Sequence, residues 1–153
     1  MTDSDMHNPQ EYLAHAATSD GLQSDREEAI LAEFLDGREN DFHHHDGKNG
    51  KPSKNLNNIV YYEVELSHKA VRRHVDAVVF YGGTDFYLVE VKDSLDDETL
   101  GQLLVREQLF RNTDPLHHFS PVKMAVVTDA DDEMARMVED RYDVRVRTVD
   151  RGL

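Results

Sequence analysis

The chain has 153 residues and a formal net charge of -14 at pH 7, with 31 acidic and 17 basic residues. It contains no cysteine, which excludes disulfides and thiolate metal sites, and it lacks an apolar run of membrane-spanning length and a signal-peptide pattern. We therefore expect one soluble, cytoplasmic domain whose abundant Asp and sparse Lys are typical of halophilic, archaeal-type proteins, the alternative being an ordinary acidic protein.

Residues 1 to 23 are predicted to be an N-terminal extension with a short helix. Asn8 followed by Pro9 is a typical helix start, and this helix would end near Ala17. A single domain is expected over residues 24 to 153.

The domain begins with a capping-box pattern, Ser24-Asp25-Arg26-Glu27, which predicts a core helix from about 25 to 36. The segment 36 to 58 then lacks periodicity and is rich in Gly, Asn and Lys. A loop of that length is either mobile or functional, and we expect a mobile loop that closes over a substrate. His43-His44-His45 lies in it, and adjacent loop histidines favour a solvated loop over a metal site.

Strand patterns follow at residues 59 to 66, 71 to 81 and 85 to 92, and Gly82-Gly83-Thr84 reads as a hairpin turn. Three consecutive strands predict an antiparallel meander. Next come a helix over 95 to 112, a buried strand over 122 to 128, a helix over 129 to 142 and a half-exposed strand over 143 to 149. The predicted fold class is α/β, with a mixed central sheet flanked by helices.

The length of this turn brings two carboxylates together. With a three-residue loop, Asp76 pairs with Glu90 across the hairpin at a Cβ separation of about 5 Å, where like charges are destabilising. Lys92 lies beside Glu90 on the same strand face. Either one carboxyl holds a proton, or a cation binds between them, or the register differs. The alternative is a surface hairpin with an ordinary Glu-Lys pair.

These residues resemble those of the PD-(D/E)XK, or restriction-endonuclease-like, nucleases. Members of that family place an Asp on the second core strand and Glu-x-Lys on the third strand of an α-β-β-β-α-β core, and the match covers about residues 24 to 128. The resemblance implies that Asp76, Glu90 and the Val91 carbonyl hold Mg²⁺, for which Mn²⁺ can substitute, while Lys92 orients the attacking water and helps to deprotonate it. Val75 stands where the Pro that gives the family its name would be.

Two helical positions also fit this family. Gln102 follows Lys92 by ten residues, and Gln102 and Arg106 lie inside an apolar arc that the sequence predicts from Leu103, Val105, Leu109 and Phe110. Buried polar groups of this kind need partners. Glu27 matches a Glu that some members carry on the first helix, although the capping box alone also explains it.

Basic residues are few, and they cluster at Lys69, Arg72 and Arg73. We expect these residues and Arg106 to contact DNA phosphates; the alternative is that they are solubilising charges. Leu100 and Leu104 lie on the other side of their helix from Gln102, which suggests a homodimer surface or packing under the last helix.

The sequence thus predicts a Mg²⁺-dependent deoxyribonuclease, similar in size to archaeal Holliday-junction resolvases. The alternative is a catalytically idle protein of the same fold that serves as a DNA-binding or protein-interaction module.

Overall fold

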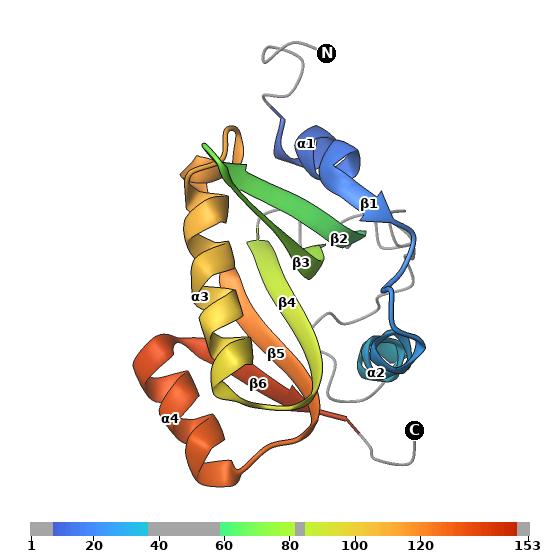
Figure 1. Cartoon of the computed structure of the whole chain (residues 1–153), viewed down its shortest axis with the longest axis vertical. Coiled ribbons are helices and arrows are strands. Elements are labelled where there is room, and N and C mark those ends of the chain that lie inside the picture. Colours follow the sequence, from blue (N-terminus) through green and yellow to red (C-terminus); the bar gives the residue numbers. More distant parts are fainter. Residues whose placement is uncertain (1–7, 37–58, 82–84, 150–153) are drawn as a thin grey trace.

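A six-stranded mixed sheet in the order β1-β2-β3-β4-β5-β6 forms the centre of the computed structural model, which describes residues 8–36, 59–81 and 85–149 (Figure 1). Strands β1 to β4 are antiparallel, whereas β4, β5 and β6 run parallel to one another. The strands are β1 (Ala17–Ser19), β2 (Ile59–His68), β3 (Val71–Tyr81), β4 (Asp85–Ser94), β5 (Val122–Asp129) and β6 (Val144–Thr148).

The helices flank both faces of this sheet. They are α1 (Pro9–Ala16), α2 (Asp25–Asp36), α3 (Asp97–Arg111) and α4 (Asp132–Tyr142), and a 3-10 turn covers Leu116–His118. Helices α3 and α4 make the connections between the parallel strands β4, β5 and β6. The predicted α/β class with a mixed sheet and flanking helices is confirmed.

Two hydrophobic cores lie on opposite faces of the sheet. The α3-side core contains side chains from α1, α3 and α4 together with Tyr61, Val78 and Leu88 of the sheet. The α2-side core contains the apolar face of α2, namely Ile30, Leu31, Phe34 and Leu35, packed on Val60, Val79, Val89 and Val126. Adjacent strand residues therefore point to opposite cores, as alternation along a strand requires.

This alternation breaks in the middle of β2 and β3. Tyr62 belongs to the α2-side core, but Val64 belongs to the α3-side core, and between them Glu63 has a φ of 47°. In β3, Val75 and Val78 both belong to the α3-side core, so the break falls at Asp76 and Ala77. The register of β2 and β3 is the same on both sides of Glu63 and Asp76, so neither strand carries an extra residue, and the irregular backbone at this one position produces the change of face.

The predicted meander and most element boundaries agree with the structure to within a few residues. The short strand β1 was not predicted, and Ala17 and Ser19 in it pair with Val64 and Tyr62. A three-residue strand is too short to carry a detectable alternation. The segment predicted as an extension therefore adds an edge strand to the sheet, and Leu13 of α1 is fully buried. The predicted turn at 82 to 84 and most of the 36 to 58 loop, including its histidines, lie outside the described residues.

Helix α3 differs in detail from the predicted apolar arc. Leu103, Leu109 and Phe110 are buried, but Val105 is 44% exposed, so its inclusion was wrong. Leu100 packs against the α3-side core, which also contains Val138 of α4. That contact supports the alternative of packing under the last helix, and it removes Leu100 from an exposed dimer surface.

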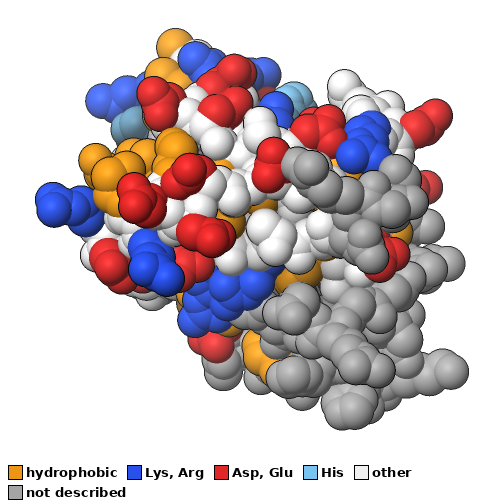
Figure 2. All heavy atoms as spheres, turned by 90° about the horizontal axis from the view of Figure 1, so that it is seen from below, with side chains coloured by type: hydrophobic (Ala, Val, Ile, Leu, Met, Phe, Trp, Pro, Cys, Tyr) orange, Lys and Arg blue, Asp and Glu red, His pale blue; other side chains and the backbone are white. Residues whose placement is uncertain are grey.

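The molecular surface reflects the acidic composition. Figure 2 shows acidic side chains spread over one face, with basic side chains interspersed among them. Within the three described segments, no helix is long and apolar enough to cross a membrane.

A buried ion pair joins α3 to the sheet. Lys123 Nζ of β5 donates to Glu107 Oε2 at 2.8 Å, and the two side chains are only 7% and 13% exposed. Removing one partner of such a pair leaves the other charge buried without compensation, which costs far more than an exposed pair contributes.

We therefore expect Glu107→Ala to lower the free energy of unfolding by about 3 kcal/mol. Urea unfolding in high salt would measure it. The control is Gln108→Ala, the next residue of α3 and an exposed one. Equal losses for the two variants would contradict a special role of the buried pair.

Candidate active site

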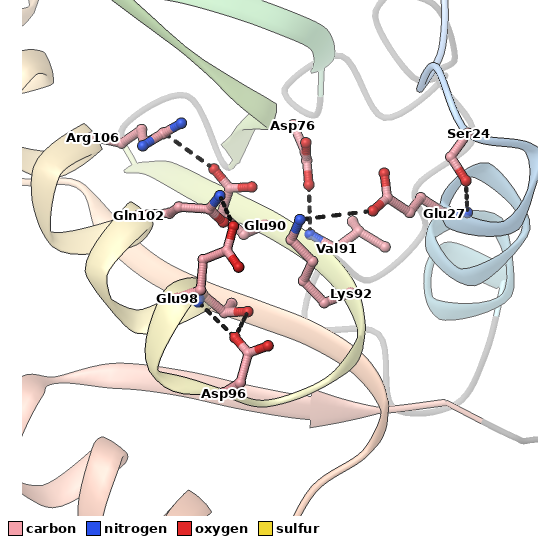
Figure 3. A network of polar contacts seen from close by, with 11 residues as sticks. Ser24, Glu27, Asp76, Glu90, Val91, Lys92, Asp96, Glu98, Gln102 and Arg106 are labelled. Atoms are coloured by element: carbon pink, nitrogen blue, oxygen red, sulfur yellow. Dashed lines mark hydrogen bonds and ion pairs between the residues drawn. The ribbon is translucent and has the colours of Figure 1, made fainter.

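The site forms where β3 and β4 stop pairing. Their backbone ladder runs from Tyr81 opposite Asp85 to Ala77 opposite Val89, which is the predicted register. At the next position the ladder ends, and the Asp76 side chain replaces a backbone acceptor. Its Oδ2 accepts a hydrogen bond from the Val91 N–H at 2.8 Å (Figure 3). A side chain thus satisfies a backbone donor where the neighbouring strand leaves.

This ending lets carboxylates from opposite faces of the sheet meet. Asp76 lies between Val75 of the α3-side core and Ala77 of the α2-side core, where the alternation breaks, and its carboxylate is near enough to Glu27 of α2 to raise the pKa of Glu27. Glu90 lies between Val89 and Val91 of the α2-side core and so points toward α3. The two carboxyl groups are nevertheless close enough for Asp76 to raise the pKa of Glu90.

Glu90 is the most strongly perturbed acid of the site. It is 3% exposed, and burial and the neighbouring Asp76 raise its pKa to about 9. Because burial and a neighbouring carboxylate disfavour the charged form, this pKa places a proton on Glu90 at neutral pH. Within the described part of the chain, Glu90 Oε1 is buried without a hydrogen-bond partner.

Two α3 side chains reach toward Glu90, as the sequence predicted for polar residues inside a buried stripe (Figure 3). Arg106 Nε lies 3.5 Å from Glu90 Oε1 and donates to the His74 carbonyl at 3.0 Å. Because the Arg106 side chain is 14% exposed, it links α3 to β3 instead of projecting from the surface. Gln102 Oε1, like Glu90 Oε1, is buried without a hydrogen-bond partner among the described residues.

Lys92 and Glu27 complete the site on the α2 side. Lys92 Nζ lies 4.0 Å from Glu27 Oε2, and both side chains are partly exposed. The Glu27 N–H donates to Ser24 Oγ at 3.2 Å, so the predicted helix cap forms and leaves the Glu27 carboxylate facing Lys92 (Figure 3). Burial and Asp76 raise the pKa of Glu27.

Sequence reasoning missed Glu63. This residue is 8% exposed, and its position in β2 is bracketed by pairs that would set it opposite Asp76. Burial and Asp76 raise the pKa of Glu63, while the Gln23 backbone N–H, a donor to the carboxylate, lowers it. A signal existed, because Glu63 lies within the apolar run of β2 just as Glu90 lies within that of β4.

The predicted residues do not all converge. Asp76, Glu90, Lys92, Glu27 and Gln102 come together, with Arg106 at the edge. Val91, predicted as a carbonyl ligand, has its N–H held by Asp76. Lys69, Arg72 and Arg73 lie on the exposed end of the β2–β3 hairpin, apart from the carboxylates.

The donor set fits only a lightly held cation. In the described segments, no group of three or more His, Asp or Glu side chains is arranged to hold a metal ion. Mg²⁺, however, keeps several waters and is commonly bound through one or two carboxylates. The adjacent Asp76 and Glu90 suit that mode of binding, since Glu90 Oε1 has an ion-pair contact with Arg106 but no hydrogen bond among the described residues.

Comparisons with known proteins give no further guidance. No protein-family model matches the chain, and neither a curated protein nor a solved structure matches it.

The raised pKa of Glu90 predicts how stability depends on pH without a metal. The folded state holds a proton that the unfolded state loses above a pKa of about 4.5, so stability falls as pH rises from there toward about 9. Glu90→Gln keeps a donor for Asp76 without that penalty. We expect it to raise the free energy of unfolding by on the order of 3 kcal/mol near pH 7, and by little near pH 4.

Urea unfolding in a chelator at these pH values would measure the difference. The exposed Glu98 of α3 provides the control, Glu98→Gln. A gain that does not grow with pH would show that Glu90 is not held protonated.

Proposed function

We propose that the protein is a metal-dependent nuclease that hydrolyses DNA phosphodiester bonds, with a restriction-endonuclease-like core. The observation that carries the proposal is the meeting of Asp76 and Glu90 at the end of the β3–β4 ladder, with Lys92 on the same strand as Glu90. A buried carboxyl pair that serves only stability has no evident benefit, because opposed like charges are costly.

The order of elements supports the core assignment. The chain runs α2-β2-β3-β4-α3-β5, which is the α-β-β-β-α-β order of that nuclease family, and the predicted positions fall on β3 and β4. Strand β4 also pairs with β5 in parallel across the α3 connection. These features are shared by many α/β proteins, so the site residues carry the functional argument.

Asp76 and Glu90 would hold Mg²⁺ or Mn²⁺, with the Val91 carbonyl beside them. When bound, such an ion lowers the pKa of a water molecule and neutralises charge that develops on the phosphate. A cation would also remove the reason for the proton on Glu90, because it favours the charged form of both carboxyls.

The remaining residues have roles set by their contacts. Lys92 would orient the attacking water, and its 4.0 Å contact with Glu27 keeps the ammonium at the site without burying it. Gln102 Oε1, buried and unpartnered within the described segments, would accept a hydrogen bond from a water on the α3 side. Arg106 would position Glu90 through their 3.5 Å contact.

One observation favours the idle-module alternative. Asp76 Oδ2 already accepts a hydrogen bond from the Val91 N–H. A protein that used this pair only to end the ladder would bind no metal. Metal binding therefore separates the two functions before any substrate is known.

We expect titration calorimetry to detect Mn²⁺ binding by the wild type and at least about 10-fold weaker binding by Asp76→Asn and Glu90→Gln. Glu98→Gln, on the same side of the site but outside the carboxyl pair, should bind as the wild type does. Absence of binding by the wild type would favour the idle module.

Cleavage tests the chemistry. Labelled linear, single-stranded, flapped and four-way DNAs would be incubated with Mg²⁺ in high KCl. We expect Asp76→Ala to abolish cleavage and Lys92→Ala to slow it by at least about 100-fold. Arg136→Gln, an exposed change on α4, is the control. Intact DNA throughout, despite metal binding, would contradict the nuclease proposal.

A further inference from the structure

The β2–β3 hairpin beyond the carboxyl site is the most basic segment among the residues that the structure describes. Between Ser67 and Val75 it carries Lys69, Arg72 and Arg73 and no acidic residue. Residues 68 to 74 are exposed. On a chain of net charge -14, a polyanion meets repulsion almost everywhere else.

The two faces of this hairpin differ. Val64, Leu66 and Val75 point into the α3-side core, and Thr113 Oγ1, after α3, donates to the Ser67 carbonyl at 3.2 Å. The hairpin therefore rests with one face on the α3 side, and the opposite face is free of that packing.

That opposite face leads to the site. The strands pair Ser67 with Arg72 and Glu65 with His74, and Asp76 follows His74 by two residues, at the position where the alternation of β3 breaks. Successive positions on one strand face are about 6.6 Å apart, so Arg72 lies about 13 Å along β3 from Asp76. This distance is about four nucleotides at a rise of about 3.4 Å per nucleotide in one DNA strand.

In the free protein, Glu65 lies against both the Arg72 guanidinium and the His74 ring of this face. Its Oε1 lies 3.7 Å from an Arg72 guanidinium nitrogen, and its Oε2 lies 4.0 Å from His74 Nε2. The Arg72 and His74 side chains are 75% and 50% exposed. Ion pairs this exposed are weak, so a phosphate can replace Glu65 at little cost.

We infer that Arg72 and His74 form a phosphate-binding track that leads DNA to Asp76, and that Glu65 is an internal counter-ion displaced when DNA binds. The inference rests on the proposed function only in placing the cleaved bond at Asp76. The track binds DNA whether or not the DNA is then cleaved. Arg72 offers a guanidinium for charge-assisted hydrogen bonds to phosphate oxygens, and His74 offers a ring N–H.

Arg73 provides a matched comparison for Arg72. It is adjacent and exposed and has the same charge, but it pairs with Leu66 and lies on the face of the α3-side core. Its guanidinium also donates back to the Arg72 carbonyl at 2.6 Å. Loss of either arginine changes the net charge by the same amount. A difference in DNA affinity between the two variants therefore comes from the strand face on which each arginine lies and not from the net charge of the protein.

The experiment measures the binding of a fluorescein-labelled DNA duplex by fluorescence anisotropy, with Ca²⁺ in place of Mg²⁺ to prevent cleavage. We expect Arg72→Gln to bind about 3- to 10-fold more weakly and to reduce the salt dependence by about one counterion. Arg73→Gln should stay within about 2-fold of the wild type, and Glu65→Gln should bind at least about 3-fold more tightly.

Equal weakening by Arg72→Gln and Arg73→Gln, or no gain from Glu65→Gln, would overturn the track. A wild type that binds no DNA would overturn it as well. If the expected pattern of binding is seen but no DNA is cleaved with Mg²⁺, the track stands and the nuclease proposal fails. If DNA is cleaved while all three variants bind alike, the nuclease proposal stands and the track fails.

Discussion

The hydrogen bond from the Val91 N–H to Asp76 Oδ2 determines how the site is built. Antiparallel strands satisfy each other's backbone groups, and the ladder between β3 and β4 stops at Ala77 and Val89. A strand that leaves its neighbour exposes unpaired donors, and a carboxylate at the branching point satisfies one of them. Asp76 thus marks the end of the β3–β4 pairing, and its side chain lies in the gap between the two strands.

The change of face in β2 and β3 brings several carboxylates together at this gap. Regular alternation would leave Asp76 on the same side of the sheet as Val78 and Glu90. The break at Glu63 and at Asp76 turns the outer half of the hairpin over, so that Val64 and Val75 enter the α3-side core. Carboxylates from β2, β4 and α2 then gather around Asp76 of β3, and burial, followed by repulsion from Asp76, raises the pKa values of Glu90, Glu63 and Glu27. Clusters of buried carboxyl groups are typical of sites that bind a charged ligand. Elsewhere they only make the free energy of folding less favourable.

Local pattern and turn length predicted much of this arrangement. A three-residue turn fixed the register of β3 and β4, and register brings Asp76 close to Glu90 whatever the rest of the chain does. Helical periodicity placed Gln102 and Arg106 on the inner side of α3 because that periodicity is a property of the segment alone. The positive φ of Glu63 could not be predicted, since Glu has no preference for that conformation and only tertiary packing imposes it. Arg106 was predicted to reach DNA, but its contacts with the His74 carbonyl and Glu90 depend on how far the hairpin bends over α3.

The same bend reconciles an acidic chain with a polyanionic ligand. In concentrated salt, screening shortens the reach of surface charge to about 3 Å, so the net charge of -14 repels DNA less than it would in dilute solution. Screening weakens attraction equally, which leaves direct contacts to decide where DNA binds. The hairpin supplies such contacts through Arg72 and His74, and Glu65 lies against both side chains until a phosphate replaces it. The irregular position at Glu63 and Asp76 that gathers the carboxylates therefore also turns Arg72 and His74 to the side from which a DNA strand can reach them.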